Sequence, residues 1–134
     1  MDNDHYTLMF DGGSRGNPGL CGCGYAILKD DVVVWEGFKK VSDNNTNNFA
    51  EYMGIILGLE LAVENNIQTL HIKGDSLLVI NQLLGKWKVN SSNLKPLYIA
   101  AKALLEKINM VTLGHVKRDK NKIADKLANK AMDE

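Results

Sequence analysis

The feature that most restricts the fold is a largely apolar run that ends in a carboxylate and a series of glycines. Residues 6–10 form the run, Asp11 follows, and residues 12–19 contain four glycines. An apolar run bounded by glycine is typical of a buried strand that enters a tight turn. We therefore expect a strand over residues 6–11, with Asp11 held rigidly at its last position. Glycines allow close backbone approach and a turn of exposed amides favours phosphate, so this stretch predicts a divalent cation between carboxylate and phosphate.

The remaining chain predicts a mixed α/β domain around this strand. Further strands are expected over residues 23–28, 32–41, 69–74 and 110–113, with a hairpin turn at 29–31. Helices are expected over 49–65, from the Asp75-Ser76 cap to about residue 84, over 94–107 and over 123–132. The first helix has an apolar stripe at positions 49, 52, 53, 56, 57 and 61. The order β-β-β-α-β-α-α-β-α predicts a five-stranded sheet, antiparallel early and parallel later, with helices on both faces.

Length and composition indicate one ordinary globular domain spanning residues 1–134. The 134 residues are 45% apolar and 24% charged, which is enough to build a core without disulfides or metal staples. No apolar run approaches the roughly 20 residues of a membrane span, and the N-terminus lacks the layout of a signal peptide. We expect a cytoplasmic monomer with no membrane association and no obligatory protein partner. Cys21 and Cys23 are expected to be two small buried thiols rather than a disulfide or zinc site.

The net charge of zero conceals an uneven distribution along the chain. Residues 1–70 carry 4 Lys/Arg against 10 Asp/Glu, and residues 71–134 carry 12 against 6, so the halves are −6 and +6. This asymmetry predicts a basic surface for a polyanion beside an acidic pocket for metal. Chance segregation of solvated faces is the simpler alternative on charge alone.

Four carboxylates occupy positions at the ends of predicted elements: Asp11, Glu51, Asp75 and Asp125. The carboxyl ends of neighbouring parallel strands meet at one edge of a sheet, so Asp11 and Asp75 are expected to lie close together. Clustered carboxylates raise one another's pKa, because each ionised acid makes ionisation of the next more costly. Hard divalent cations between them remove that cost. Mg²⁺ prefers oxygen ligands, and two such ions roughly 4 Å apart can promote phosphodiester cleavage.

These acids lie within four blocks through which the chain resembles the type 1 ribonuclease H family over nearly its whole length. The blocks are Asp11-Gly-Gly-Ser-Arg-Gly-Asn-Pro-Gly19, Thr46-Asn-Asn-Phe-Ala-Glu51, Gly74-Asp-Ser76 and His115-Val-Lys-Arg-Asp-Lys-Asn-Lys-Ile-Ala-Asp125. The resemblance implies a ribonuclease H-like fold and an endoribonuclease that cuts the RNA strand of RNA–DNA hybrids. It also implies two Mg²⁺ or Mn²⁺ ions held by Asp11, Glu51, Asp75 and Asp125, and products with 3′-hydroxyl and 5′-phosphate ends.

Further site residues follow from the same resemblance. His115 matches the histidine that assists proton transfer or product release, although an exposed loop histidine is the plain alternative. The turn backbone at Gly12 and the amides of Asn17, Asn47 and Asn48 match groups that read the 2′-hydroxyl of RNA. These asparagines could instead serve turns and caps. Thr46 matches a residue that holds a DNA-strand phosphate, and Asn121 is expected to contact substrate or steady the last loop.

The chain departs from many family members in one region. Only residues 85–93 separate the second and third helices, so the extra basic helix that grips the hybrid is expected to be absent. Trp87, between Lys86 and Lys88, could contact the DNA strand there or belong to the core, and Trp35 is expected to be core. Weak hybrid binding that depends strongly on salt follows from this loss.

Three other functions are compatible with parts of the sequence. A hybrid- or double-stranded-RNA-binding module that does not cut would gain from losing clustered negative charge near phosphates. A mononucleotide cradle lacks the Gly-Lys-Ser/Thr ending and the helix expected after its loop. A DNA resolvase or transposase core shares the fold, but the amides at positions 17, 47 and 48 favour RNA.

Overall fold

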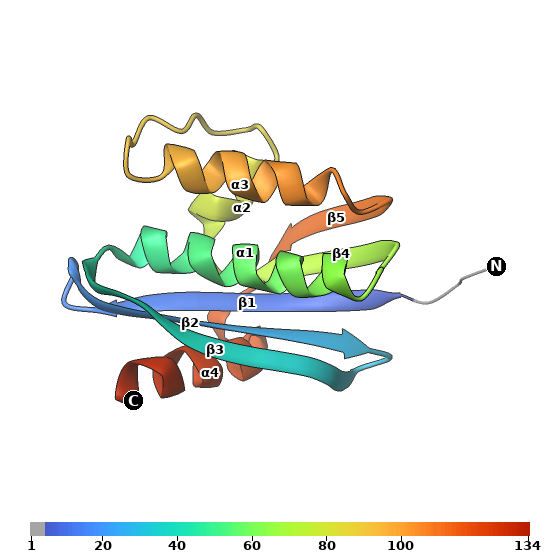
Figure 1. Cartoon of the computed structure of the whole chain (residues 1–134), viewed down its shortest axis with the longest axis horizontal. Coiled ribbons are helices and arrows are strands. Elements are labelled where there is room, and N and C mark those ends of the chain that lie inside the picture. Colours follow the sequence, from blue (N-terminus) through green and yellow to red (C-terminus); the bar gives the residue numbers. More distant parts are fainter. Residues whose placement is uncertain (1–4) are drawn as a thin grey trace.

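The computed structural model describes residues 5–134 and contains one five-stranded mixed sheet with helices on both faces (Figure 1). The strands are β1 (Tyr6–Arg15), β2 (Gly19–Lys29), β3 (Val32–Asn45), β4 (Thr69–Gly74) and β5 (Met110–His115), in the order β3-β2-β1-β4-β5. The helices are α1 (Asn47–Glu64), α2 (Leu77–Leu83), α3 (Lys95–Leu105) and α4 (Lys122–Asp133), with a short 3₁₀ helix η1 (Arg118–Lys120). This is the predicted element order.

The first three strands form the predicted antiparallel meander. The hairpin between β2 and β3 turns at Asp30 and Asp31, whose φ angles of 52° and 66° are the positive values that a tight two-residue hairpin requires. β1 pairs antiparallel with β2 and parallel with β4, and β4 pairs parallel with β5. The expected change from antiparallel to parallel pairing within the sheet is therefore confirmed.

The prediction that the first strand ends at Asp11 is wrong. β1 continues through Gly12 and Gly13 to Arg15 and pairs with β2 along this length, and the chain turns only at residues 16–18. The parallel pairing with β4, however, does end at Phe10 opposite Gly74. Asp11 is therefore the first residue of β1 beyond its pairing with β4, so no strand pairs with it on that side although β1 itself continues.

The glycine at position 12 serves close packing rather than a turn. A Cβ atom there would lie 2.2 Å from the backbone carbon of Ala50 and 2.5 Å from the amide nitrogen of Glu51. No side chain fits in that space. Gly12 therefore lets the first turn of α1 lie directly on β1, next to Asp11.

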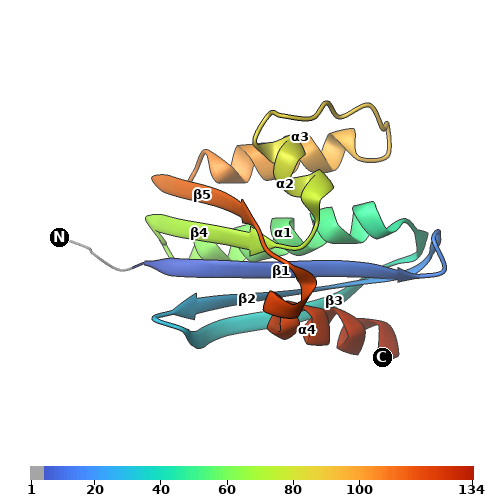
Figure 2. The same ribbon diagram turned by 180° about the vertical axis from the view of Figure 1, so that it is seen from behind.

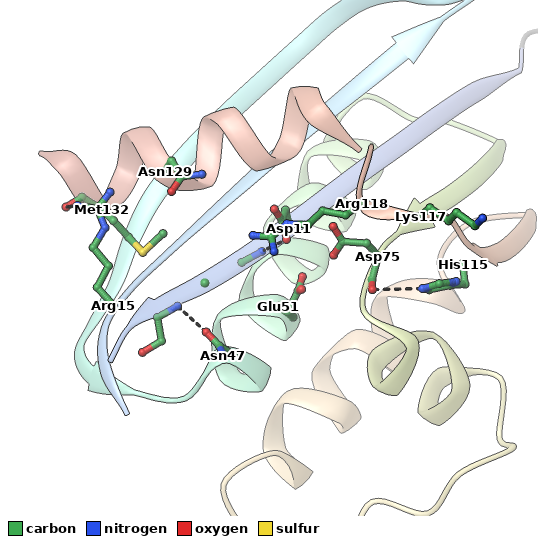
Figure 3. A pocket seen from close by; sticks show the side chains of 13 residues that line it. Asp11, Arg15, Asn47, Glu51, Asp75, His115, Lys117, Arg118, Asn129 and Met132 are labelled. Atoms are coloured by element: carbon green, nitrogen blue, oxygen red, sulfur yellow. Dashed lines mark hydrogen bonds between the residues drawn. The ribbon is translucent and has the colours of Figure 1, made fainter. Parts of the chain in front are cut away.

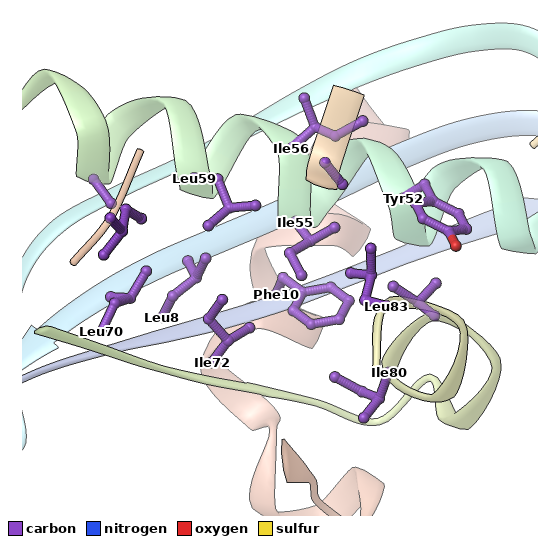
Figure 4. Packing of buried hydrophobic residues seen from close by; sticks show 14 of the residues in the cluster. Leu8, Phe10, Tyr52, Ile55, Ile56, Leu59, Leu70, Ile72, Ile80 and Leu83 are labelled. Carbon is purple, nitrogen blue, oxygen red and sulfur yellow. The ribbon is translucent and has the colours of Figure 1, made fainter. Parts of the chain in front are cut away.

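The main core lies between the sheet and α1, and α2 and α3 pack against the same side (Figures 1 and 4). Leu8 and Phe10 of β1 and Ile72 of β4 point from the sheet toward α1, and all three are almost completely buried. The second face is covered by α4, which packs on β1, β2 and β3 (Figure 2). Side chains alternate along a strand, so successive residues of β1 point in turn into the main core and toward α4.

The predicted apolar stripe of the first helix is only partly correct. Tyr52 and Ile56 are buried as expected, but Ile55 and Leu59 are fully buried without having been assigned to the stripe. The helix is enclosed by the sheet on one side and by α3 on the other, so burial extends around more of its circumference than one stripe. The expectation that Trp35 is core is also too strong, because Trp35 is half-buried at the edge of the core, beside Tyr6.

The connection between α2 and α3 contains no helix, so the extra basic helix is absent from the described residues. No helix among residues 5–134 is long and apolar enough to cross a membrane. Cys21 and Cys23 are buried free thiols in β2, and burial raises the pKa of Cys23 to about 12.

Candidate active site

The carboxyl ends of the three parallel strands meet at one edge of the sheet and bring the predicted acids together. In register, Phe10 lies opposite Gly74 and Gly74 lies opposite His115. The residues that follow in β1 and β4 are Asp11 and Asp75. Glu51 reaches the same place from the first turn and a half of α1, whose N-cap is Thr46. Figure 3 shows the side chains of Asp11, Glu51 and Asp75 directed toward one another.

Three carboxylates form a compact group. One oxygen from each of Asp11, Glu51 and Asp75 lies within 4.8 Å of the others. Asp125, near the start of α4, is close enough to Asp11 to raise the pKa of its carboxyl but is not one of that compact group. An Oδ1 atom of Asp125 lies 3.8 Å from the Arg118 guanidinium. The four acids thus converge from four separate elements, three closely and the fourth beside Asp11.

The electrostatics of the group reflect burial and like charge. Burial, with the nearby charges of Asp75 and Asp125, raises the pKa of Asp11 from 3.8 to about 7. Burial and the carboxylates of Asp11 and Asp75 raise the pKa of Glu51 well above its usual value. The hydrogen bond from the Gly12 amide to Asp11 Oδ1, 2.9 Å long, opposes the shift at Asp11 but does not cancel it. Without a counter-charge, keeping Asp11 and Glu51 ionised in the folded protein therefore costs free energy.

The donor set fits divalent cations. Carboxylate oxygens are the ligands that Mg²⁺ and Mn²⁺ prefer. Oε1 of Glu51 is buried and has no hydrogen-bond partner within the described part of the chain. A buried polar atom without a partner is costly, and a bound cation would satisfy it. Asp11, Glu51, Asp75 and Asp125 are the residues that would hold such ions.

Asp11, Glu51 and Asp75 line an open cleft of about 610 Å³. Several further lining residues had no predicted role. They come from β1, from the loop after β5 and from α4: Ser14, Arg15, Lys117, Arg118, Asn129 and Met132. The excess of basic residues in the last loop was a visible signal for Lys117 and Arg118. Helical spacing was the signal for Asn129 and Met132, which lie four and seven residues after Asp125 on α4.

His115, the last residue of β5, lines the same cleft. Its Nε2 atom lies 3.3 Å from the backbone oxygen of Asp75, and its side chain is exposed (Figure 3). The histidine is therefore next to the acids and in contact with solvent.

Two of the predicted amides connect the turn after β1 to the start of α1. Asn47 Oδ1 accepts a hydrogen bond of 2.7 Å from the Ser14 amide, and Asn17 Oδ1 accepts one of 3.1 Å from the Asn47 amide. Both residues are exposed. The Oδ1 atoms of Asn17 and Asn47 thus hold the turn against the start of α1, which is the structural role considered as the alternative to reading the 2′-hydroxyl. Their NH₂ groups remain available as donors. Gly12 and Asn47 line the carboxylate cleft.

Asn17, Thr46 and Asn48 line a neighbouring polar groove of about 510 Å³ rather than the cleft itself. The Thr46 hydroxyl accepts a hydrogen bond of 3.2 Å from the Phe49 amide and so caps α1. Ser76 caps α2 in the same way through the Val79 amide.

Two predicted substrate-binding residues lie elsewhere. Asn121 is completely buried, and its Nδ2 donates to the Phe10 carbonyl, so its side chain offers no surface to a substrate. Of the two roles considered for it, only the steadying of the loop agrees with the structure. Trp87 is 44% exposed and lines a separate hollow with Lys86, Lys88 and Ile99, so it is not core.

Comparison with known proteins agrees with this geometry. A family model described as reverse transcriptase-like matches residues 9–131. A protein of Mycobacterium tuberculosis named as bifunctional is 42% identical over 128 residues, which cover 95% of this chain and 35% of that protein. Ribonuclease HI of Halobacterium salinarum is 39% identical over 93% of this chain and 63% of its own length. Ribonuclease H of Pseudomonas fluorescens is 32% identical over 98% and 92%.

Solved structures show the same relationship. The crystal structure of RNase H1 from Halobacterium salinarum superposes with a TM-score of 0.91 at 38% identity, covering 96% of this chain and 98% of that one. LC11-RNase H1 in complex with an RNA/DNA hybrid superposes with a TM-score of 0.88 at 30% identity, covering 96% of both chains. The fold and its acidic edge thus define an α/β domain of the ribonuclease H-like class.

More narrowly, the chain belongs to the type 1 ribonuclease H family. It spans about a third of the length of the mycobacterial relatives that it matches.

Proposed function

We propose that this chain is an endoribonuclease that hydrolyses the RNA strand of RNA–DNA hybrids with two divalent cations, Mg²⁺ or Mn²⁺. The observation that carries the proposal is the convergence of Asp11, Glu51 and Asp75, whose oxygens lie within 4.8 Å, with Asp125 beside Asp11. Their location in an open cleft next to basic residues suits a phosphodiester rather than a small neutral substrate.

The four acids would hold the cations, and the burial of Asp11 and Glu51 favours a bound counter-charge there. When bound, the two ions supply the Lewis-acid assistance on which two-metal phosphodiester hydrolysis depends. Glu51 is almost fully buried near the start of α1, where Thr46 caps the helix, so its carboxylate faces the site from a regular element. This arrangement leaves 3′-hydroxyl and 5′-phosphate ends if water attacks and the 3′ oxygen leaves.

His115 would move the proton. It is exposed, ends β5 and lies within 3.3 Å of the Asp75 backbone oxygen, so its ring is near the acids without being one of their counter-ions. A histidine titrates near neutral pH and can give a proton to a departing oxygen or take one from water.

Substrate choice would depend on the amides near the turn after β1. Asn47 lines the cleft, and Asn17 and Asn48 line the adjacent groove with Thr46. A hybrid lying across both hollows would present its RNA 2′-hydroxyls to amide groups and the backbone at Gly12, and a DNA phosphate to Thr46. The similar LC11-RNase H1 has been crystallised with an RNA/DNA hybrid, which supports this class of substrate.

The surface around Trp87 would replace the missing basic helix. The indole is 44% exposed between Lys86 and Lys88, and Lys95 lines the same hollow. An aromatic ring with flanking ammonium groups can pack on sugars and attract phosphates. With so few cations, binding would be weak and strongly dependent on salt.

The domain would act as a single unit over residues 1–134, as a monomer in the cytoplasm and without an obligatory protein partner. The experiment is a cleavage assay on a labelled RNA–DNA hybrid with Mg²⁺, Mn²⁺ or chelator, comparing wild type with Asp11→Asn. We expect cleavage by the wild type with metal only and none by the variant. Equal cleavage by the variant would refute the metal assignment.

The non-cutting binding module and the DNA nuclease are separated by the same assay. Hybrid binding without cleavage under every metal condition would identify a binding module. Cleavage of double-stranded DNA with equal efficiency would identify a nuclease without RNA selectivity. In that case Asn17→Ala and Asn47→Ala would leave the ratio of hybrid to DNA cleavage unchanged.

A further inference from the structure

We propose that His5 and His71 form a second cation site, selective for borderline divalent cations such as Zn²⁺ or Ni²⁺. His71 lies in β4, in register with Thr7 of β1 and Thr112 of β5. His5 immediately precedes β1. The pair is on the face of the sheet opposite to Leu70 and Ile72, which point into the core.

This part of the sheet is open. α4 packs on β1, β2 and β3, and among the described residues no helix covers the same face of β4 and β5 (Figure 2). His5 is exposed and His71 is half-buried. A shallow hollow of about 340 Å³, lined by Thr7, His71, Lys73 and Thr112, marks the place where an ion could enter.

The spacing of the two rings suits one tetrahedral ion. Nδ1 of His5 lies 3.4 Å from Nε2 of His71, and the rings are within 20° of parallel. Two imidazole nitrogens, each about 2.0–2.1 Å from a tetrahedral Zn²⁺, lie roughly 3.3–3.4 Å apart. The nitrogens therefore already have the separation that a shared ion requires, and the exposed His5 ring can turn its lone pair toward that ion.

Thr112 prepares His71 for this role. The Thr112 hydroxyl lies 2.7 Å from Nδ1 of His71. If Nδ1 carries the proton and donates it to this hydroxyl, Nε2 is left as the bare nitrogen facing His5. Metal-binding histidines generally have such a partner for their second nitrogen, which fixes both the tautomer and the ring orientation.

The chemistry of the site separates it from the carboxylate cleft. Imidazole favours Zn²⁺, Ni²⁺ and Cu²⁺, whereas carboxylate clusters favour Mg²⁺ and Mn²⁺. Waters would complete the coordination of an ion held by two protein ligands. The Lys73 ammonium lines the same hollow and lowers the affinity for any cation, so Lys73→Gln is expected to strengthen binding.

The test is a titration with Zn²⁺, and separately with Ni²⁺, in excess Mg²⁺ that occupies the carboxylate cleft. Calorimetry and the imidazole signals in NMR spectra report binding, and the chain has only three histidines to assign. We expect one saturable site that shifts the signals of His5 and His71. His5→Gln and His71→Gln should abolish it, Thr112→Val should weaken it about tenfold, and His115→Gln should leave it unchanged.

The alternative is a simple hydrogen-bonded histidine pair. Zn²⁺ binding that survives His71→Gln, or that disappears with His115→Gln, would overturn the proposal, as would the absence of saturable binding by the wild type. Because His5 and His71 lie at the surface, circular dichroism melts of both variants should match the wild type, so loss of folding does not confuse the result. The outcome is independent of ribonuclease activity.

Discussion

The side-chain amide of Asn121 donates a hydrogen bond to the backbone carbonyl of Phe10, with Nδ2 and O 2.8 Å apart. The bond joins the residue before Asp11 to the residue before α4, which carries Asp125. Both partners are completely buried. Two acids that are more than a hundred positions apart in the chain are thus positioned by one amide that touches neither of them.

Removing this amide should therefore affect both stability and cleavage. Asn121→Ala leaves the Phe10 carbonyl buried without its partner, which costs about 1–3 kcal/mol. The loss is partly offset because Asn121 Oδ1 is itself buried and has no partner in the described part of the chain. Asn121→Asp should cost more than the alanine variant, since a carboxylate cannot donate to the carbonyl and adds charge beside the acids. Urea denaturation of both variants measures the order, and the reverse order would contradict this role.

A methyl group at position 12 should disrupt the contact between α1 and β1. Gly12→Ala would place a Cβ 2.2 Å from the Ala50 backbone, where nothing can yield without moving the helix. We expect a loss of at least about 3 kcal/mol, the upper end of the usual cost of overpacking. Gly114→Ala is the matched control, because its Cβ would meet nothing within 4 Å, and it should change stability by less than about 0.5 kcal/mol. Equal destabilisation by the two variants would show that packing at Gly12 is not the cause.

Removal of one charge from the acidic group should stabilise the metal-free protein while abolishing cleavage. Glu51→Gln is nearly isosteric and removes the carboxylate whose pKa is raised by burial and by Asp11 and Asp75. We expect a higher Tm than wild type in chelator at pH 8, and little further increase when Mg²⁺ is added. Glu60→Gln, at an exposed site on the same helix, is the control. A lower Tm for Glu51→Gln in chelator would count against electrostatic repulsion within the group.

The pH dependence of the metal-free protein should show the raised pKa of Asp11. An acid with a pKa of about 7 when folded and 3.8 when unfolded keeps its proton longer in the folded state. Its contribution to stability is then fully present below pH 3.8 and is lost as the pH rises toward 7. Stabilisation by Mg²⁺ should therefore be larger at pH 8 than at pH 5. Asp11→Asn should reduce that difference, with the remainder due to Glu51, whose pKa is also raised. Melting curves with and without Mg²⁺ at the two pH values measure both effects, and an unchanged difference in Asp11→Asn would contradict the raised pKa of Asp11.

Hybrid binding should depend on few phosphate contacts around Trp87. Lys86→Ala and Lys88→Ala should each weaken binding and reduce the slope of log affinity against log salt by about 1. Lys107→Ala, beyond the opposite end of α3, is the control and should leave the slope unchanged. Fluorescence anisotropy with catalytically inactive Asp11→Asn protein measures the binding. A wild-type isotherm that is flat between low and physiological salt would contradict this basic surface.

Sequence patterns alone predicted the order of elements and the mixed sheet, because these depend on local apolar periodicity and on turn residues. Motif spacing singled out the four acids, and the structure brings three of them together at one edge of the sheet. The hairpin at Asp30-Asp31 and the cap at Ser76 were predictable for the same reason: each depends on a few neighbouring residues. Arg118 and Met132 also line the cleft; the sequence carried a signal for each, but only the packing of α4 and the last loop against β1 brings them there.

What only the tertiary structure decided was where strands end, which side chains are enclosed and which oxygens meet. β1 extends past Asp11 because β2, which begins at Gly19, supplies hydrogen-bond partners along its other side. Both strands are rich in glycine there, so the local apolar pattern did not report this pairing. The sequence left substrate contact open as a role for Asn121, and the packing of α4 on the sheet excludes it by burying the side chain completely. Burial and proximity are properties of the assembled chain, and these two quantities set the charge state of Asp11 and Glu51.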